Sequence, residues 1–323
     1  MKKIQTNYQC KICGNTSNYK EYFVPEMQLG LRDEFVYIYC NDCNSLQIKE
    51  IPTILDRYYP NEQYYSFSTT KQQRFVSSFL QTTISKCSFS QKGLLSRIID
   101  KYSLYDYSLL SVGKLNPPKN WRILDVGTGS GSLLYKLKQL GFSNLMGIDP
   151  FLDEETYQIE IKKTSLEKLE ENEIFDLIMF HHSFEHTANP IETLIAAKNH
   201  LKEKGLILIR SPIVSYAFEK YAENWFQIDA PRHLHIQSLR GIKIMLDKVG
   251  LKINEIYYDS TYSQFLISEN YSHNISMNES QKGFFSSLIS MLFSPTKRKF
   301  RIEAKKLNKL AEGDSVTYYV SKK

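Results

Sequence analysis

The chain has 323 residues, of which 42% are hydrophobic, and it carries a formal net charge of +6. This length can form one large α/β domain with a small accessory domain, and the apolar content supports a packed core. The charge is too small to require a nucleic-acid partner, but it suits an anionic or nucleotide-linked acceptor. The first residues are not typical of a signal peptide and no apolar stretch is long enough to span a membrane, so we expect a cytoplasmic protein.

Cysteine residues are concentrated near the beginning of the chain. Four of the five cysteines form two C-x-x-C pairs, Cys10 with Cys13 and Cys40 with Cys43. Two such turns can present four thiolates as a tetrahedron, the geometry that zinc prefers, and the alternating segment 34–39 between them is typical of a strand. We therefore predict a structural zinc ribbon over residues 1–50. Disulfide bonds are an alternative that a reducing cytoplasm disfavours, and a redox-active pair would need a thioredoxin-like pattern around it.

Residues 51–118 form a region rich in tyrosine and phenylalanine. Apolar residues recur at helical spacing between residues 71 and 113, which predicts one or two helices. Pro60 interrupts any helix in the tyrosine-rich part, and Pro117-Pro118 end the region.

The segment Trp121–Gly131 reads W-R-I-L-D-V-G-T-G-S-G and predicts a ligand-binding turn. Its apolar residues indicate a short buried strand with Asp125 at its end. Gly127, Gly129 and Gly131 then let the backbone turn closely around a ligand and enter a helix. A dinucleotide-binding turn usually has an apolar residue in place of Asp125. A carboxylate here suits a ligand with an ammonium or sulfonium charge, although a dinucleotide site and an inactive relic are alternatives.

A second strand follows one helix later. Leu133–Leu140 has helical periodicity, and Leu145–Ile148 is an apolar strand closed by Asp149. Asp149 lies 22 positions after Gly127, a spacing at which a carboxylate reaches ribose hydroxyls.

These two motifs resemble the class I S-adenosylmethionine-dependent methyltransferases, and the resemblance extends over residues 121–250. It implies that Asp125 lies near the methionine ammonium group and that Asp149 binds the ribose. Ser165 and Leu166, after a possible third strand, occupy the position that contacts adenine, where aspartate is frequent in the family. The cofactor-binding residues predicted on this basis are Tyr64, Asp125, Gly127, Thr128, Gly129, Gly131, Asp149, Ser165, Leu166 and His181.

Tyr64 belongs to a double-tyrosine segment, residues 56–67. This segment resembles the one that precedes the core in zinc-ribbon-bearing sugar methyltransferases, where it folds over the cofactor. The resemblance implies a lid formed by Tyr64 and Tyr65, with Tyr58 and Tyr59 nearby. Aromatic packing against the core is the alternative.

The apolar strand Phe175–Phe180 opens onto His181-His-Ser-Phe-Glu-His186. The carboxyl end of such a strand lines the cleft of an open α/β sheet, and histidine is the natural acid or base near neutral pH. The Glu185-His186 pair resembles the fourth motif of the ubiquinone-biosynthesis-like methyltransferases. We predict His182 and His186 as candidate general bases and Glu185 as an acceptor-binding residue. Alternatively, the pair only fixes the loop by hydrogen bonds.

The strand Gly205–Arg210 is followed by a long segment that mixes polar and aromatic residues. Its P-R-H-L sequence matches a segment common in methyltransferases from polysaccharide and nucleotide-sugar pathways. We predict Asp229 and Arg232 as acceptor-binding residues, with Arg232 holding a phosphate or carboxylate, and His233 and His235 as further candidate bases. Structural hydrogen bonding at the sheet edge is the alternative.

The end of the chain contains a strand, an insertion and a final strand. Leu251–Asp259 is the sixth strand of the core, and Gly313–Val320 is predicted as an antiparallel edge strand. Between them, an apolar run over residues 284–293 precedes a basic run over residues 297–301. The segment 284–301 could rest on an anionic membrane surface, or form a cap helix with a solvated basic end.

Taken together, the sequence predicts an α/β protein with a Rossmann-like seven-stranded methyltransferase sheet, helices on both of its faces, and an N-terminal zinc ribbon. The predicted parts are a zinc ribbon (1–50), a helical and aromatic lid region (51–118), an S-adenosylmethionine-binding core (119–268), a helical insertion (269–312) and the last strand (313–323). The predicted function is methyl transfer from S-adenosylmethionine to a small-molecule acceptor, a nucleotide-linked sugar, with a histidine base. Alternatives are an RNA or protein methyltransferase that reads its substrate with the ribbon, and a non-catalytic cofactor-binding scaffold.

Overall fold

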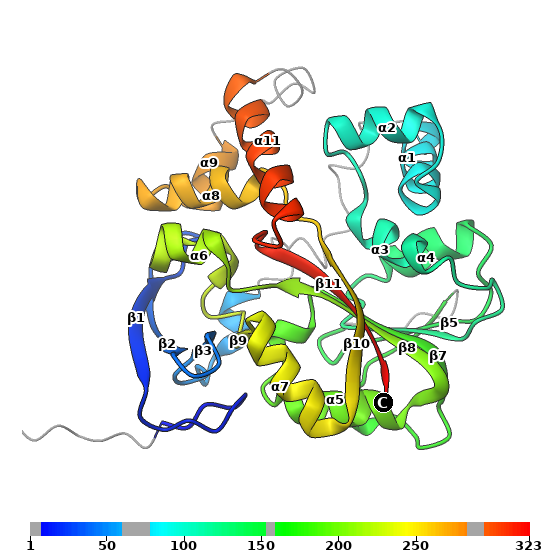
Figure 1. Ribbon diagram of the computed structural model, residues 1–323, viewed down its shortest axis with the longest axis horizontal. Helices are drawn as coiled ribbons and strands as arrows, with labels where there is room; N and C mark the ends of the chain where they lie inside the picture. Colours follow the sequence, from blue (N-terminus) through cyan, green and yellow to red (C-terminus); the bar gives the residue numbers. More distant parts are fainter. Residues whose placement is uncertain (1–7, 60–77, 153–158, 283–293) are drawn as a thin grey trace, which may run out of the picture.

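Two β-sheets form the frame of the protein in a computed structural model (Figure 1). The structure describes residues 8–59, 78–152, 159–282 and 294–323. A seven-stranded sheet carries the predicted cofactor turn, and a four-stranded sheet contains the cysteine-rich beginning of the chain.

The seven-stranded sheet has the strand order β10-β11-β8-β7-β4-β5-β6. Strands β4 to β8 pair in parallel, whereas β11 is antiparallel to both of its neighbours. The strands are β4 (Ile123–Val126), β5 (Leu145–Ile148), β6 (Glu160–Lys162), β7 (Phe175–His181), β8 (Leu201–Pro212), β10 (Leu251–Tyr258) and β11 (Ser315–Lys322). The predicted α/β fold with a seven-stranded sheet is confirmed. Strand β8 begins at Leu201, earlier than the predicted Gly205, and β11 lies between two strands instead of at the sheet edge.

Helices cover both faces of this sheet because its central strands are apolar on both sides. In β7, Leu177 and Met179 pack with α3 and α4, whereas Ile178 and Phe180 pack with α5 and α7 on the opposite face. The helices over the described part of the chain are α1 (Ser78–Ser90), α2 (Leu94–Lys101), α3 (Tyr107–Leu115), α4 (Ser132–Gln139), α5 (Pro190–Asn199), α6 (Tyr216–Tyr221), α7 (Leu239–Val249), α8 (Ser263–Ser272), α9 (Met277–Lys282) and α11 (Pro295–Lys309).

The cysteine-rich segment forms an antiparallel sheet of order β1-β2-β3-β9, called the ribbon sheet below. Its strands are β1 (Tyr19–Pro25), β2 (Glu34–Cys40), β3 (Ser45–Ile48) and β9 (His235–Ile236). Strand β9 comes from the P-R-H-L-H segment of the core, where Ile236 pairs with Leu46 and His235 pairs with Gln47. A unit ending at residue 50 therefore lacks one strand of its own sheet.

Besides the hydrophobic clusters on the two faces of the seven-stranded sheet, a further cluster joins the ribbon sheet to the insertion. Tyr37 and Leu46 of the ribbon sheet belong to the same buried cluster as Phe218 of α6, Phe265 of α8 and Ala304 of α11. In Figure 1 the ribbon sheet lies beside α6, with α8 and α9 on the far side of α6.

The basic run of the insertion, residues 297–301, is solvated only in part: Arg298 and Lys299 are exposed, whereas the other two basic residues are buried. Arg301 is only 6% exposed, and its guanidinium donates to the carbonyl oxygen of Tyr102. Lys297 is also buried. The apolar part of the proposed membrane segment, residues 284–293, lies outside the described residues. Within the described ranges, every helix is too short or too polar to cross a bilayer.

Candidate active site and metal centre

The glycine-rich turn follows β4 and has the left-handed backbone that the sequence predicted. Gly127, Gly129 and Gly131 have φ angles of +72°, +52° and +73°, which favour glycine. Space is also limiting, because a β-carbon on Gly127 would lie 2.5 Å from the β-carbon of Ser183. The backbone can therefore approach a ligand closely here only because these positions have no side chain.

Two buried carboxylates stand on either side of this turn. Asp125 is 4% exposed and accepts a hydrogen bond of 2.9 Å from the Thr128 hydroxyl. Asp149, at the end of β5, accepts hydrogen bonds from the backbone N–H groups of Gly129 (3.0 Å) and Phe151 (2.9 Å). Burial raises the pKa of Asp149, and burial together with the charge of Asp149 raises the pKa of Asp125 to about 7.

A cavity of about 400 Å³, called the cofactor cavity, opens at the carboxyl ends of β4, β5 and β7. Among the predicted site residues, those that line it are Gly127, Gly129, Asp149, Ser165, Leu166, His182 and His186. Asp125, Thr128, Gly131 and His181 do not line it. Asp125 in β4 and Thr128 within the turn are instead hydrogen-bonded to each other. Tyr64 and Tyr65 lie outside the described residues.

Within the described part of the tyrosine-rich segment, Tyr59 lines the cofactor cavity. Its ring stacks on Phe151, with centroids 6.0 Å apart and an interplanar angle of 9°, and its hydroxyl lies 3.1 Å from Nδ1 of His186. Tyr58 instead turns away and donates to Asp33 of the loop that precedes β2.

A second cavity of about 290 Å³, called the acceptor cavity, adjoins the first. His182 lines both cavities. Twelve of the fifteen lining residues of the acceptor cavity are polar or charged, and among them His182, Asp229 and His233 were predicted from sequence. Arg210 and Asp259, at the ends of β8 and β10, were missed. Both are charged residues that terminate apolar strands, which is the signal that could have identified them.

His182 is held between the two cavities by charged neighbours. Its Nδ1 lies 3.1 Å from Oε1 of Glu185, and its Nε2 contacts the guanidinium of Arg210, which is paired with Asp259 at 2.6 Å. Since a guanidinium only donates, Nε2 accepts and Nδ1 donates. Burial opposes ionisation of Glu185, but the hydrogen bond from His182 and the neighbouring imidazoles lower its pKa to about 2.

His186 and His233 also face the boundary between the cavities. Nδ1 of His186 lies 2.9 Å from the carbonyl oxygen of Arg232, and Nδ1 of His233 lies 2.7 Å from that of Gln227. Each ring is thereby fixed with its proton on Nδ1, leaving the Nε2 lone pair free. Burial, with the proximity of His233, lowers the pKa of His186 to about 4.

His235 and His181 do not occupy the predicted positions. His235 is 1% exposed and belongs to β9, where its ring packs on Phe184 and its Nε2 lies 3.2 Å from the Thr187 hydroxyl. It lines neither cavity, so it is not placed to act as a base on an acceptor. The ring nitrogens of His181 are buried without a hydrogen-bond partner among the described residues, and burial holds the pKa of this imidazole well below its usual value.

Arg232 is not available to an acceptor phosphate, contrary to the sequence prediction. It is completely buried and forms ion pairs with Asp229 (2.6 Å) and with Glu26 (2.9 Å). Its guanidinium also donates to the carbonyl oxygen of Tyr58 at 3.1 Å. Glu26 belongs to the loop after β1, so Arg232 connects the ribbon sheet to Asp229 in the wall of the acceptor cavity.

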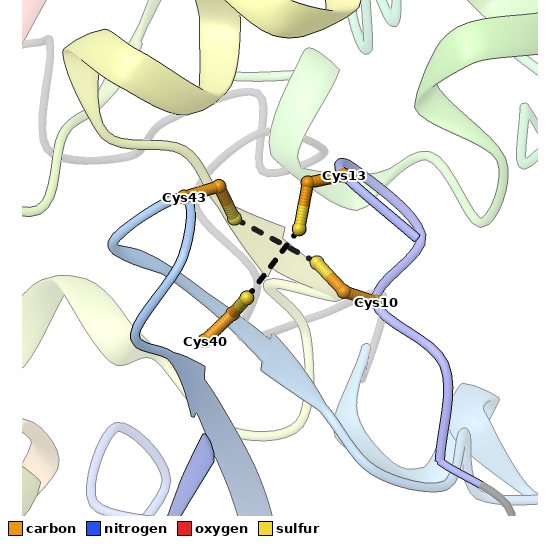
Figure 2. A group of neighbouring side chains, drawn as sticks. All are labelled: Cys10, Cys13, Cys40 and Cys43. Carbon is orange, nitrogen blue, oxygen red and sulfur yellow. Dashed lines mark hydrogen bonds between the residues drawn. The ribbon is translucent and has the colours of Figure 1, made fainter. Parts of the chain in front are cut away.

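The four cysteines of the two C-x-x-C pairs converge at one point (Figure 2). All four are free thiols; Sγ of Cys10 lies 3.7 Å from Sγ of Cys43, and Sγ of Cys13 lies 3.5 Å from Sγ of Cys40. Four sulfurs bound to zinc at about 2.3 Å would lie about 3.8 Å apart in a tetrahedron. The donor set and its spacing therefore fit a zinc ion with no open coordination position.

The cysteine cluster is joined to α7 of the core. Ser238, the N-cap of α7, donates to the carbonyl oxygen of Cys43 at 2.5 Å and accepts from the N–H of Gly241 at 2.9 Å. A β-carbon at Gly241 would collide with the hydroxyl of Ser45. The ribbon sheet and the core are thus closely packed at this contact, where serine side chains of each bond to the backbone of the other.

Comparison with known proteins identifies the fold and its family. A family model described as a methyltransferase domain matches residues 80–256, more than half of the chain. The chain belongs to this methyltransferase family. It is therefore placed among the S-adenosylmethionine-dependent methyltransferases of class I, as the glycine turn and the strand order indicate.

Individual relatives are distant. Ubiquinone biosynthesis O-methyltransferase of Rickettsia canadensis is 23% identical over 167 residues, 46% of this chain and 71% of that protein. The tRNA U34 carboxymethyltransferase of Vibrio cholerae is 24% identical over 156 residues, 42% of this chain and 46% of that protein. A SAM-dependent methyltransferase structure from Archaeoglobus fulgidus is 18% identical, with a TM-score of 0.42, and the match covers 72% of this chain and 100% of that one. The matched part of the tRNA enzyme is thus less than half of its length.

Proposed function

We propose that this methyltransferase transfers a methyl group from S-adenosylmethionine to a hydroxyl group of a small, hydroxyl-rich acceptor, a sugar carried on a nucleotide. The observation that carries the proposal is the shared position of His182, which lines both a cavity with the family's cofactor residues and an adjoining polar cavity. Methyl transfer needs two ligands side by side, and this arrangement provides two adjoining cavities with one side chain between them.

The residues of the cofactor cavity suit the parts of S-adenosylmethionine. Asp149 is placed to accept from ribose hydroxyls, and Asp125 supplies a negative charge behind the turn for the methionine ammonium group. Leu166, which is buried, and Ser165 form the wall for the adenine, and the stacked Tyr59 covers the cavity from the ribbon side. When bound, S-adenosylmethionine supplies a methyl group on a positively charged sulfur, which is the electrophile.

The composition of the acceptor cavity favours a hydroxylated acceptor. Its walls include the carboxylates Asp229 and Asp259, the guanidinium of Arg210 and the amides of Gln28 and Gln264. A cavity with this many donors and acceptors suits a molecule with several hydroxyl groups, because unpaired polar groups on either side would lose binding energy.

Proton removal from the acceptor hydroxyl is assigned to the groups at the boundary. His182, His186 and His233 lie there, whereas His235 does not. The Nε2 lone pair of His233 on the acceptor side is the best placed of these, since Nε2 of His182 is already occupied by Arg210.

The test of the proposal is binding followed by turnover. Calorimetry with S-adenosylmethionine should show one site per chain, and a panel of sugar nucleotides should contain an acceptor that forms S-adenosylhomocysteine. His233→Asn should lower kcat by about 100-fold or more with little change in cofactor affinity, whereas the exposed His273→Asn serves as the matched control. Methylation of tRNA or of a protein in place of every sugar nucleotide would overturn the acceptor assignment, and cofactor binding without any turnover would favour the scaffold alternative.

The affinity for S-adenosylmethionine is expected to depend on pH through Asp125. The pKa of this carboxyl is about 7 in the folded protein against a usual 3.8, so below pH 7 it holds a proton that must leave when an ammonium group binds beside it. We expect Kd to rise about tenfold per unit between pH 7 and pH 5, and binding at pH 6 to release about 0.9 proton. Calorimetry in buffers of different ionisation enthalpy measures both quantities.

Asp125→Asn is the control for this pH dependence. The variant should bind about 100-fold more weakly at pH 8, because it lacks the charge, and its affinity should vary little between pH 7 and pH 5. An unchanged slope in the variant would assign the titration to another group, such as Asp149. In the free protein the same shift has a stability consequence: the folded state holds the proton longer than the unfolded chain, so this carboxyl contributes less stability as pH rises from about 4 to 7.

A further inference from the structure

Glu185, His186 and His233 form a compact cluster at the boundary between the two cavities. One ligand atom of each residue lies within 4.8 Å of the other two. His186 lines the cofactor cavity and His233 lines the acceptor cavity, and their rings meet edge to face with centroids 4.8 Å apart.

The two imidazoles are fixed in the manner of metal ligands. Each Nδ1 lies within hydrogen-bond distance of a backbone carbonyl oxygen, at 2.9 Å for His186 and 2.7 Å for His233. A carbonyl oxygen only accepts, so the proton of each neutral ring is on Nδ1 and the lone pair is on Nε2. Histidines that bind metals almost always donate their other ring N–H in this way, since the bond fixes the tautomer and the ring orientation.

The carboxylate of Glu185 lacks a partner on one oxygen. Glu185 is completely buried, and its Oε2 has no hydrogen bond among the residues that the structure describes. Oε1 is the oxygen that contacts His182, and it lies 3.8 Å from Nε2 of His233, too far for a hydrogen bond. A buried carboxylate oxygen and a nearby imidazole lone pair are both acceptors, and a cation is the group that would satisfy them together.

The charge around the cluster favours a cation as well. Glu185 lies close to the ion-paired group formed by Glu26, Asp229 and Arg232, because Nε2 of His233 is 3.9 Å from Asp229 and 3.8 Å from Glu185. The ion-paired group thus has two carboxylates for one guanidinium, and Glu185 adds a third carboxylate on the other side of His233. A divalent cation would balance the remaining negative charge.

We propose that Glu185, His186 and His233 bind a divalent transition-metal ion through two imidazole nitrogens and one carboxylate oxygen. This ligand set suits zinc, manganese, iron or cobalt and leaves coordination positions open toward the acceptor cavity. Metal bonds of about 2.1 Å would place neighbouring ligand atoms about 3.0 to 3.4 Å apart, so the side chains would close by up to about 1.5 Å. An acceptor hydroxyl that binds such an ion releases its proton to solvent water more readily. With the ion bound, the Nε2 lone pair of His233 is a ligand, so the ion takes the place of His233 in assisting this step; this role, unlike the binding itself, rests on the proposed function.

The test uses Mn²⁺, because this ion prefers oxygen and nitrogen ligands and does not compete for the four thiolates once they hold zinc. The full chain is first loaded with one equivalent of zinc, and free Mn²⁺ is then followed by electron paramagnetic resonance during a titration without any acceptor. We expect one Mn²⁺ per chain with a Kd below about 100 µM. Glu185→Gln and His233→Gln should each weaken this binding by about 100-fold or more, and His273→Asn should leave it unchanged.

The titration of the unaltered chain keeps the result informative if a variant does not fold. Failure of the zinc-loaded chain to bind Mn²⁺ or a second zinc ion at 1 mM would overturn the proposal, as would equal Mn²⁺ affinity in folded Glu185→Gln. If a chain whose site holds no ion transfers methyl groups at an unchanged rate, the proposed function stands and the ion has no part in it. Binding of Mn²⁺ without turnover of any acceptor would support the site and overturn the function.

Discussion

Replacing Cys43 by serine is expected to abolish zinc binding by the ribbon and to lower the free energy of unfolding by more than about 5 kcal/mol, since structural zinc sites supply about 10 to 16 kcal/mol in isolated domains. Cys43 is buried, its Sγ is 3.7 Å from that of Cys10, and its carbonyl oxygen accepts from Ser238 at the start of α7. Zinc content by mass spectrometry and urea unfolding followed by circular dichroism measure the two effects.

The fifth cysteine provides the matched control for this experiment. Cys87→Ser changes the same atom in α1, away from the cluster, and should retain one zinc per chain with a stability change of less than about 1 kcal/mol. A Cys43→Ser protein that keeps its zinc and its stability would show that the four thiols do not act as one metal site.

Replacing Arg232 by alanine is expected to lower the free energy of unfolding by about 3 to 5 kcal/mol, because it leaves two buried carboxylates without their cation. Asp229 and Glu26 would lose ion pairs of 2.6 Å and 2.9 Å, and the carbonyl of Tyr58 would lose a donor. Chemical denaturation of the purified variant measures this loss directly.

An exposed ion pair is the control for Arg232. Lys202 is half exposed and lies 2.8 Å from Asp176, so Lys202→Ala should change stability by less than about 1 kcal/mol. If Arg232→Ala were as stable as the original protein but bound an anionic acceptor more weakly, the sequence-based assignment of Arg232 as an acceptor ligand would be restored.

The features that could be predicted from sequence are those encoded in neighbouring residues. The alternation or continuity of apolar residues in β4, β5, β7 and β10 identified the strands, and the glycines after Asp125 identified the turn, because each signal depends on local backbone geometry. The grouping of the four cysteines at one point could also be predicted, since two C-x-x-C turns in one chain are typical of a metal site.

Features that depend on distant partners were not visible. Strand β9 has two residues, too few for any periodicity, and it exists because β3 offers an unpaired edge. The burial of Arg232 depends on Glu26, which lies 206 positions earlier in the chain. His235 was indistinguishable from His233 by residue type, but His235 belongs to β9 and contacts Phe184 and Thr187, whereas His233 precedes this strand and lines the acceptor cavity.

The closing of the ribbon sheet by β9 also constrains how the protein is made. Ser45 bonds to Ser238, 193 positions away, and β3 pairs with the residues just before Ser238. During synthesis, β3 therefore leaves the ribosome long before β9, and its edge stays unpaired until β9 has been made. Unpaired strand edges promote association with other chains. Early capture of the metal would hold the first three strands in place while the rest of the polypeptide emerges.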